Sequence, residues 1–232
     1  MLRRSLLLAT GATLAAGTAR AFPYGDRLGF VAHRNGQRIG THLLTFRQEG
    51  DRHIVSTEID FAVRLLGIVA YRYRHRAQEI WSGDQFQAIA TETDDNGDKY
   101  ALKVQREGAN LIAQRREPQS FFKTSGGEEA LHQQHWTREV HPGNLLPSTH
   151  WNIAQTRQRA LLNTQTGKIT HVAIRDVGRE TVRTATAAPP ATHFAYTGDI
   201  TMDQWFDDQG RWVKATFKAA TDGSTIEYTL QG

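Results

Sequence analysis

A histidine and a carboxylate in one short segment are the residues best suited to acid–base chemistry. His75 and Glu79 have the same parity within Tyr71–Trp81, so an extended chain would place both side chains on one face. Such a pair can donate and accept a proton. Four residues of strand separate them by roughly 13 Å, so each would need a partner from a neighbouring strand. If the protein is a periplasmic hydrolase or lyase, we expect its catalytic residues to be His75, Glu79 and Asp207.

One histidine pair has the spacing of metal ligands. His132 and His135 would face one ion from a helix, and His141 or His150 could add a third ligand. The glutamate that follows the first histidine in hydrolytic zinc motifs is replaced by Gln133. Histidines in such a polar segment are usually solvated, so we expect no bound metal and no cofactor.

The segment Asp94-x-Asn96-x-Asp98 begins like a calcium-binding loop. Such a loop needs a glycine at its sixth position and a glutamate at its twelfth, but this chain has Lys99 and Gln105 there. Asn96 is followed by glycine, the pair that favours a tight hairpin turn. We therefore expect a turn at this place and not a calcium site.

The elements that must position these side chains are predicted to be β-strands. Between Tyr71 and Gln78, aromatic or small residues alternate with arginines and a glutamine, which is the two-residue period of a half-buried strand. Turn signals such as Asn35-Gly36 recur at spacings of about ten residues, as in all-β sandwiches and barrels. Sequential hairpins predict an all-β fold, a single curved antiparallel up-and-down meander in the form of a half-barrel or barrel.

Residues 117–144 interrupt this pattern, because they are poor in alternation and rich in glycine, histidine and polar residues. We expect a long irregular excursion over the sheet, with one or two short helices and a role as a lid. The best helical candidates are Glu128–Trp136 and a short turn near Ser148–Gln155. The large aromatics Trp81, Trp205 and Trp212 lie on strand segments, where such rings mostly fill the core.

The first 21 residues are predicted to be a secretory signal peptide. Arg3 and Arg4 precede an apolar stretch too short to span a bilayer, and a small-x-small site ends at Ala21. The paired arginines favour the twin-arginine route. We expect a periplasmic protein whose residues 22–232 form one β-rich domain, with no transmembrane segment after cleavage.

Composition excludes several classes of function. The chain carries 28 basic and 24 acidic residues, but three of the arginines belong to the leader, which leaves 25 against 24. A nearly neutral chain lacks the basic footprint of a nucleic-acid binder, so we expect no nucleic-acid partner. There is no cysteine, which excludes disulfides, thiolate catalysis and thiolate metal sites. Nucleophile elbows, phosphate loops and dinucleotide fingerprints are absent from the sequence.

A set of motifs is spread along most of the chain. They are Gly36-x-x-Ile39-Gly40, Tyr71-x-Tyr73-x-His75-x-x-x-Glu79-x-Trp81, Thr93-Asp94-Asp95-Asn96-Gly97, Trp151-Asn152, Leu162-Asn163-x-x-x-Gly167, Trp205-x-Asp207-x-x-Gly210-Arg211-Trp212-Val213 and Asp222-Gly223-Ser224-x-Ile226-x-Tyr228. Together these motifs resemble a family of exported proteobacterial proteins of unknown function. The resemblance implies an exported β-rich domain and assigns no activity. In the spacing of its predicted strands and turns alone, the chain is also similar to open β half-barrels of the envelope that carry lipid or lipoprotein.

These patterns favour a non-catalytic module that binds an apolar or amphipathic ligand, such as a lipid, on the concave face of a curved sheet. A hydrolase or lyase and an envelope scaffold remain as alternatives. The arginines at positions 72, 74 and 76 are most simply a solvated strand face, but they could also contact an anionic membrane surface. The residues expected to bind the ligand are Tyr71, Tyr73, His75, Glu79, Trp81, Trp151 and Asn152.

Overall fold

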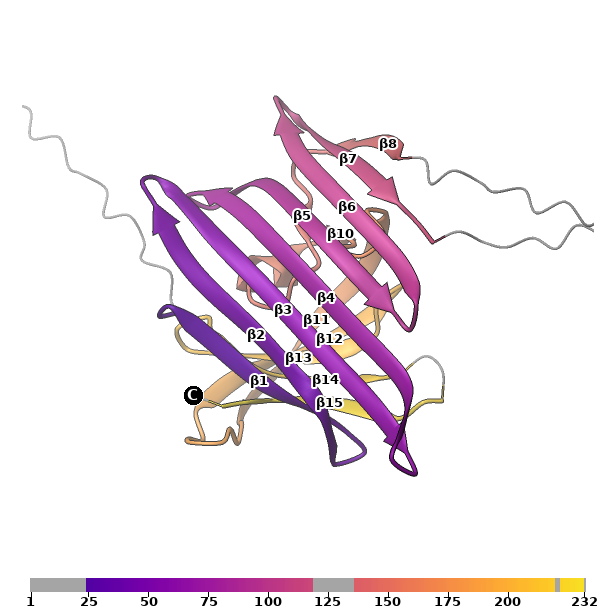
Figure 1. Ribbon diagram of the computed structural model, residues 1–232. Helices are drawn as coiled ribbons and strands as arrows, with labels where there is room; N and C mark the ends of the chain where they lie inside the picture. The colour runs from indigo at the N-terminus through magenta and orange to yellow at the C-terminus, as the bar shows by residue number, and fades with distance from the viewer. Residues whose placement is uncertain (1–23, 119–135, 220–221, 232) are drawn as a thin grey trace, which may run out of the picture.

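The computed structural model describes residues 24–118, 136–219 and 222–231 (Figure 1). The first half of the chain folds through consecutive hairpins, so each strand pairs with the next along the sequence. These strands are β1 (Arg27–Arg34), β2 (Gln37–Glu49), β3 (Arg52–Leu65), β4 (Ile68–Ser82), β5 (Gln85–Asp95), β6 (Asp98–Glu107), β7 (Asn110–Arg116) and β8 (Thr137–Pro142).

The second half of the chain continues the same sheet behind the first half, as Figure 1 shows. The two halves join where the first strand pairs with the last, in a register that includes Phe30 opposite Leu230. The second half contains β9 (Leu146–Pro147), the 3-10 helix η1 (Ile153–Arg157), β10 (Ala160–Leu162), β11 (Ile169–Thr181), β12 (Pro190–Gly198), β13 (Met202–Asp207), β14 (Trp212–Lys218) and β15 (Thr225–Leu230).

This arrangement confirms the predicted all-β meander, a curved sheet of 15 strands with β8 and β9 at the two ends of its order. Two details differ from the prediction. β9 runs parallel to β10, so the sheet is not antiparallel throughout. The helix found among the described residues, η1, lies after the excursion and near the turn predicted at Ser148–Gln155.

The predicted excursion at residues 117–144 is in part regular structure. Its final section forms β8, which pairs with β7 from Asn110 to Arg115. Residues 119–135 lie outside the described chain, and with them the predicted metal ligands His132 and His135 and most of the helix expected at Glu128–Trp136. The predicted signal peptide also lies outside the described residues, which begin at Tyr24.

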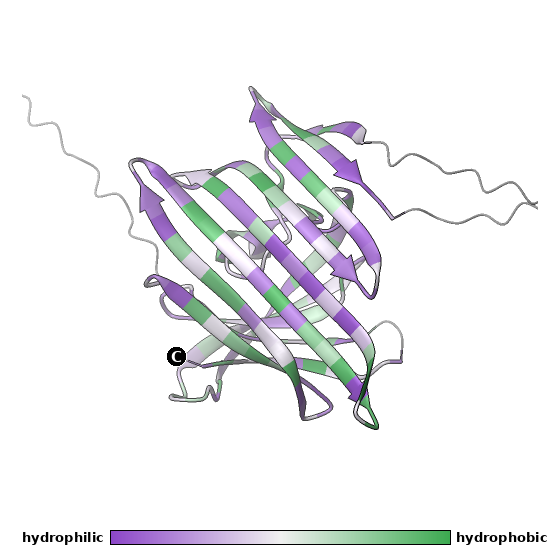
Figure 2. Cartoon of the chain, viewed as in Figure 1, coloured by the Kyte–Doolittle hydropathy of each residue, from purple (hydrophilic) through white to green (hydrophobic). Residues whose placement is uncertain are grey.

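The two-residue period predicts the faces of β4 correctly. His75, Ala77, Glu79 and Trp81 are buried on the inner face, and the intervening residues point outward. Figure 2 shows the same alternation of hydrophilic and hydrophobic residues along the neighbouring strands. Side chains of one parity therefore form the interior between the two halves of the sheet.

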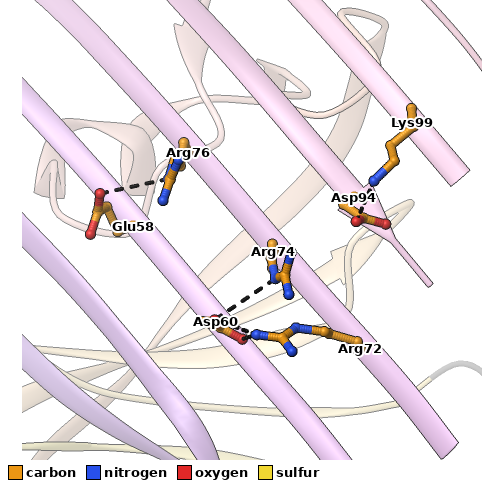
Figure 3. Close-up of polar contacts among 7 residues, drawn as sticks. All are labelled: Glu58, Asp60, Arg72, Arg74, Arg76, Asp94 and Lys99. Carbon is orange, nitrogen blue, oxygen red and sulfur yellow. Dashed lines mark hydrogen bonds and ion pairs between the residues drawn. The ribbon is translucent and has the colours of Figure 1, made fainter. Parts of the chain in front are cut away.

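On the outer face, the arginines of β4 lie beside carboxylates of β3, as Figure 3 shows. Arg72 contacts Asp60 at 2.9 Å, Arg74 contacts the same carboxylate at 3.9 Å, and Arg76 contacts Glu58 at 3.7 Å. Exposed pairs of this kind contribute little to stability, about 0–1 kcal/mol each. They do balance the positive charge of this face, which is therefore a solvated strand surface.

Asparagine–glycine pairs form the tight turns that the sequence predicts. Asn35 and Asn96 have φ angles of 48° and 54°, and each is followed by a glycine that also has a positive φ. Asp94 accepts a hydrogen bond from the backbone N–H of Gly97 at 2.9 Å and pairs with Lys99. The segment that resembles a calcium loop is therefore a hairpin turn.

Aromatic side chains fill a large part of the interior. Trp81 and Trp212 are 1% and 0% exposed and belong to the main core. Trp205 is 7% exposed and packs in a separate small cluster with Val213, so all three have the predicted role in packing. Phe30 packs against Trp212 with ring centroids 4.0 Å apart. No helix among the described residues has the length and apolar character required to cross a membrane.

Substitution of Gly40 tests how closely β2 approaches β3. A Cβ atom at this position would lie 1.9 Å from the carbonyl oxygen of Asp60, a backbone atom that cannot move alone. We expect Gly40→Ala to lower the free energy of unfolding by about 2–3 kcal/mol in chemical denaturation. Gly29→Ala is the matched control, because a Cβ there meets no atom within 4 Å, and it should be neutral or slightly stabilising. Equal effects of the two substitutions would contradict this packing.

Candidate functional site

The inner face of the sheet contains a cavity of about 810 Å³. Its walls come from β2, β3 and β4 on one side and from β14 and β15 on the other. Residues 148–150 and Thr164 line the cavity from the segments around β9 and β10. Apolar side chains dominate the walls, and they include Ile59, Phe61, Tyr73, Phe217, Ile226 and Tyr228.

Strand register explains how the main wall forms. Inward-facing residues of β3 lie directly opposite inward-facing residues of β4, with Ile59 opposite His75 and Phe61 opposite Tyr73. The Phe61 and Tyr73 rings have centroids 6.1 Å apart and stack nearly parallel. Cross-strand pairs of this kind stabilise a sheet and present one continuous surface. The alternation predicted from sequence therefore places Tyr71, Tyr73 and His75 in the cavity wall.

One part of the cavity lining has buried polar atoms that the described residues leave without hydrogen-bond partners. They are both ring nitrogens of His42, the hydroxyls of Thr57 and Thr149, and Nδ1 of His150. All four residues line the cavity. We call this group the polar floor. A buried polar atom without a partner costs about 1–3 kcal/mol, so a polar group entering the cavity would find hydrogen-bonding sites already in place.

Aromatic rings hold the polar floor in position. The imidazole of His42 lies 5.7 Å from that of His150, 5.3 Å from Trp212 and 5.5 Å from Tyr228, measured between ring centroids. His150 stacks on Trp212 at 4.8 Å. These contacts fix both imidazoles, and a hydrogen bond with the Gln204 side chain also orients His150.

The histidines of the cavity are uncharged at neutral pH. Burial lowers the pKa of His75 and of His150 to about 4. Burial, with repulsion from His150 and His75, also holds the pKa of His42 well below its usual value. His75 Nδ1 lies 2.7 Å from the Thr93 hydroxyl, so a neutral partner and not a carboxylate orients this ring. The polar floor therefore offers neutral donors and acceptors.

Glu79 lies outside this cavity, fully buried between two indoles. Its carboxylate oxygens accept hydrogen bonds from Nε1 of Trp81 at 2.9 Å and from Nε1 of Trp151 at 3.1 Å. Burial raises the pKa of the carboxyl to about 7, although both indole bonds act in the opposite direction. The two indoles, with centroids 5.3 Å apart, connect β4 to the segment before η1. Glu79, Trp81 and Trp151 thus form a structural cluster beside the cavity.

Two further predicted site residues stabilise local turns. The side chain of Asn152 accepts a hydrogen bond from the backbone N–H of Ala154 at 2.9 Å and caps η1. Asp207 accepts bonds from the backbone N–H groups of Gln209 and Arg211, and its other oxygen contacts the Arg211 guanidinium at 2.7 Å. The structure does not bring Asp207 together with His75 or Glu79 as an acid–base group.

The tyrosines have polar partners as well as apolar contacts. The hydroxyl of Tyr71 donates to Asp95 at 2.6 Å, and that of Tyr73 donates to Gln165 at 3.2 Å. Burial raises the pKa of both phenols. Tyr71 and Asp95 both line the cavity, so its wall carries a few polar groups as well as apolar ones.

Sequence reasoning missed the polar floor. The available signal is parity, because His42 has the same parity as the apolar Leu44 and Phe46 and so faces inward with them. His141, considered as a third metal ligand, is buried with Nε2 at 2.9 Å from the Gly167 carbonyl oxygen. Among the described residues, no three histidine, aspartate or glutamate side chains come together to hold a metal ion.

Glu79→Gln tests the buried carboxylate. The raised pKa means that the stability contributed by Glu79 is complete below about pH 4.5 and is lost as the pH rises through about 7. The stability of wild type relative to Glu79→Gln should therefore fall between pH 4.5 and 8, by up to ~3 kcal/mol. Chemical denaturation of both proteins across this pH range measures the difference between their free energies of unfolding. The buried histidines have the opposite pH dependence, but they are present in both proteins and their contribution cancels. A difference independent of pH would contradict this assignment.

Comparisons with known proteins agree with this geometry. A crystal structure of a beta-barrel-like protein of the domain of unknown function DUF1849 from Brucella abortus has a similar fold, with a TM-score of 0.57 and 8% identity. The similarity covers 88% of this chain and 94% of that one. No curated protein matches the chain. The model of the domain of unknown function DUF6134 matches residues 30–231, and the chain belongs to that family.

Proposed function

We propose that this protein is exported to the periplasm and binds an amphipathic small molecule in the cavity of its curved sheet. The observation that carries the proposal is the combination of apolar walls with a buried polar floor in one cavity. The volume of about 810 Å³ lies within the range of about 300–1,000 Å³ typical of small-molecule sites. The leader with paired arginines supports export.

The chemistry of the cavity suggests how such a ligand would lie. Ile59, Phe61 and Ile226 would contact an apolar chain. The neutral imidazoles of His42 and His150 and the hydroxyls of Thr57 and Thr149 would meet an uncharged hydrogen-bonding group, such as a hydroxyl, ester or protonated carboxyl. Precisely placed polar groups in an apolar pocket set the orientation of a ligand.

Catalysis is less well supported by this geometry. The proposed acid–base pair would need His75 and a carboxylate to meet in the cavity, but His75 contacts Thr93 and the carboxylate of Glu79 is bonded to two indoles. Binding without chemistry requires neither group to react. An envelope scaffold without a ligand is the outcome if the cavity proves unable to bind one.

The first test asks whether the cavity is the binding site. We expect mass spectrometry of protein purified from its native periplasm to find an extractable amphiphile, and a fluorescent fatty-acid probe to compete with it. Ile59→Trp places an indole in the cavity and should weaken probe binding about tenfold or more, because it occupies the volume of the apolar chain. Thr45→Trp adds the same ring to an exposed position on β2 and serves as the control. Equal binding by both variants would contradict the proposal.

The second test uses the polar floor. His42→Phe keeps the aromatic packing but removes two buried nitrogens that have no partner among the described residues. We expect the ligand-free variant to be more stable than wild type by about 1 kcal/mol, and to bind the native amphiphile more weakly. Thermal denaturation and probe competition measure the two effects. Unchanged ligand affinity in a folded variant would show that His42 does not contact the ligand.

A further inference from the structure

The turn between β3 and β4 exposes an unusual concentration of large apolar side chains. Leu65, Leu66, Ile68 and Val69 are 61%, 103%, 73% and 39% exposed. We call residues 65–69 the apolar tip. Figure 2 shows it as a hydrophobic hairpin end that projects beyond the body of the sheet. Exposed apolar residues that lie together, unlike scattered ones, mark a surface that contacts something else.

The backbone conformation of the apolar tip is one that disfavours leucine, so the leucine at its centre needs another explanation. Leu66 has a φ of 51° and precedes Gly67 at 83°, which is the conformation of the Asn35-Gly36 and Asn96-Gly97 turns. Asparagine tolerates this left-handed conformation, whereas leucine is disfavoured in it. Leu66 is also fully exposed, so its side chain gains no packing in return. Neither local conformation nor burial explains a leucine at this position.

The apolar tip adjoins the cavity. Leu65 belongs to the tip and also lines the cavity, together with the adjacent Val63, Ala70 and Tyr71. A surface that the tip contacts would therefore lie close to the cavity.

Basic residues lie beside the apolar tip, on the side of the β1–β2 hairpin. Arg34, Arg38 and Arg64 line a groove between the β1–β2 and β3–β4 hairpins, and none of the residues lining it is acidic. Arg34 pairs with Asp222, and Arg64 donates to the carbonyl oxygen of Gly67 at 3.2 Å. The segment from Phe61 to Tyr71 contains no acidic residue. The outer face of β4 differs, because its arginines lie beside Asp60 and Glu58.

We propose that the apolar tip inserts into a lipid bilayer that carries anionic headgroups, with Arg38 and Arg64 contacting those headgroups. A bilayer suits this surface better than a protein does, because one hairpin turn is far smaller than the ~800 Å² per partner of a standard protein interface. A fluid acyl region accepts a projecting apolar group without a complementary shape, and basic residues beside it favour an anionic surface. The inference goes beyond ligand binding, since the tip could dock whether or not the cavity is filled.

The proposal is tested by sedimentation of the protein, without its predicted leader, with vesicles of equimolar phosphatidylglycerol and phosphatidylcholine. We expect wild type to bind these vesicles and Leu66→Asn to bind about tenfold more weakly or worse, because the inserted leucine is lost. Leu66→Asn introduces the residue found in the Asn35-Gly36 and Asn96-Gly97 turns, so the melting temperature of this variant should equal or exceed that of wild type. Val140→Asn removes an exposed apolar side chain from β8, away from the tip in Figure 1, and should bind like wild type.

A charge variant and a second tip variant complete the experiment. Arg38→Gln with Arg64→Gln should weaken binding to the mixed vesicles but not to pure phosphatidylcholine, and Ile68→Ser should repeat the loss seen with Leu66→Asn. Absence of binding by wild type, or equal binding by Leu66→Asn and Val140→Asn, would overturn the proposal. Fluorescent-probe binding in solution should be unchanged in Leu66→Asn, which separates membrane docking from the cavity. Loss of probe binding in this variant would assign the tip to the ligand instead and would also overturn the proposal.

Discussion

The structure depends on one geometric constraint: a curved sheet must fill the space enclosed by its inner face. In a strand, only alternate residues can contribute to that space. In this protein, one part of the interior is packed with rings such as Trp81, Phe86 and Trp151. The remaining part is the cavity, where the inward residues of β3 and β4 form a wall. Phe61 reaches Tyr228 of β15, with ring centroids 5.8 Å apart, but the side chains still leave a space of about 810 Å³. The binding site proposed above is the portion of the interior that the chain leaves unfilled.

The buried cluster around Glu79 supports the packed part of the interior. Its carboxylate accepts a hydrogen bond from Trp81 and another from Trp151, which lies 72 positions after Glu79 in the chain. An isolated buried charge is costly, and two indole donors offset that cost only in part, which agrees with a raised pKa. Trp151 directly follows Thr149 and His150, two residues of the polar floor. The cluster therefore fixes the segment that provides part of the polar floor.

Local rules explain what the sequence predicts well. Alternation assigns Tyr71, Tyr73 and His75 to the inner face, and asparagine–glycine pairs mark turns at Asn35 and Asn96. The features missed depend on residues far apart along the chain or on weak local signals. β9 and β10 have two and three residues, too few to show a period. The polar floor combines His42 with His150, whose proximity no local pattern reveals. The turn at Leu66 lacks the residue type that usually marks such a turn.

A crystal structure of protein purified from its native periplasm is the most direct test of the central claim, that the unfilled interior is a ligand site with apolar walls and a buried polar floor. We expect elongated electron density along Ile59 and Phe61, with a polar end within hydrogen-bond distance of His42 or His150. A cavity closed by inward collapse of its walls, or a protein partner bonded to the His42 nitrogens and to Nδ1 of His150, would contradict the account.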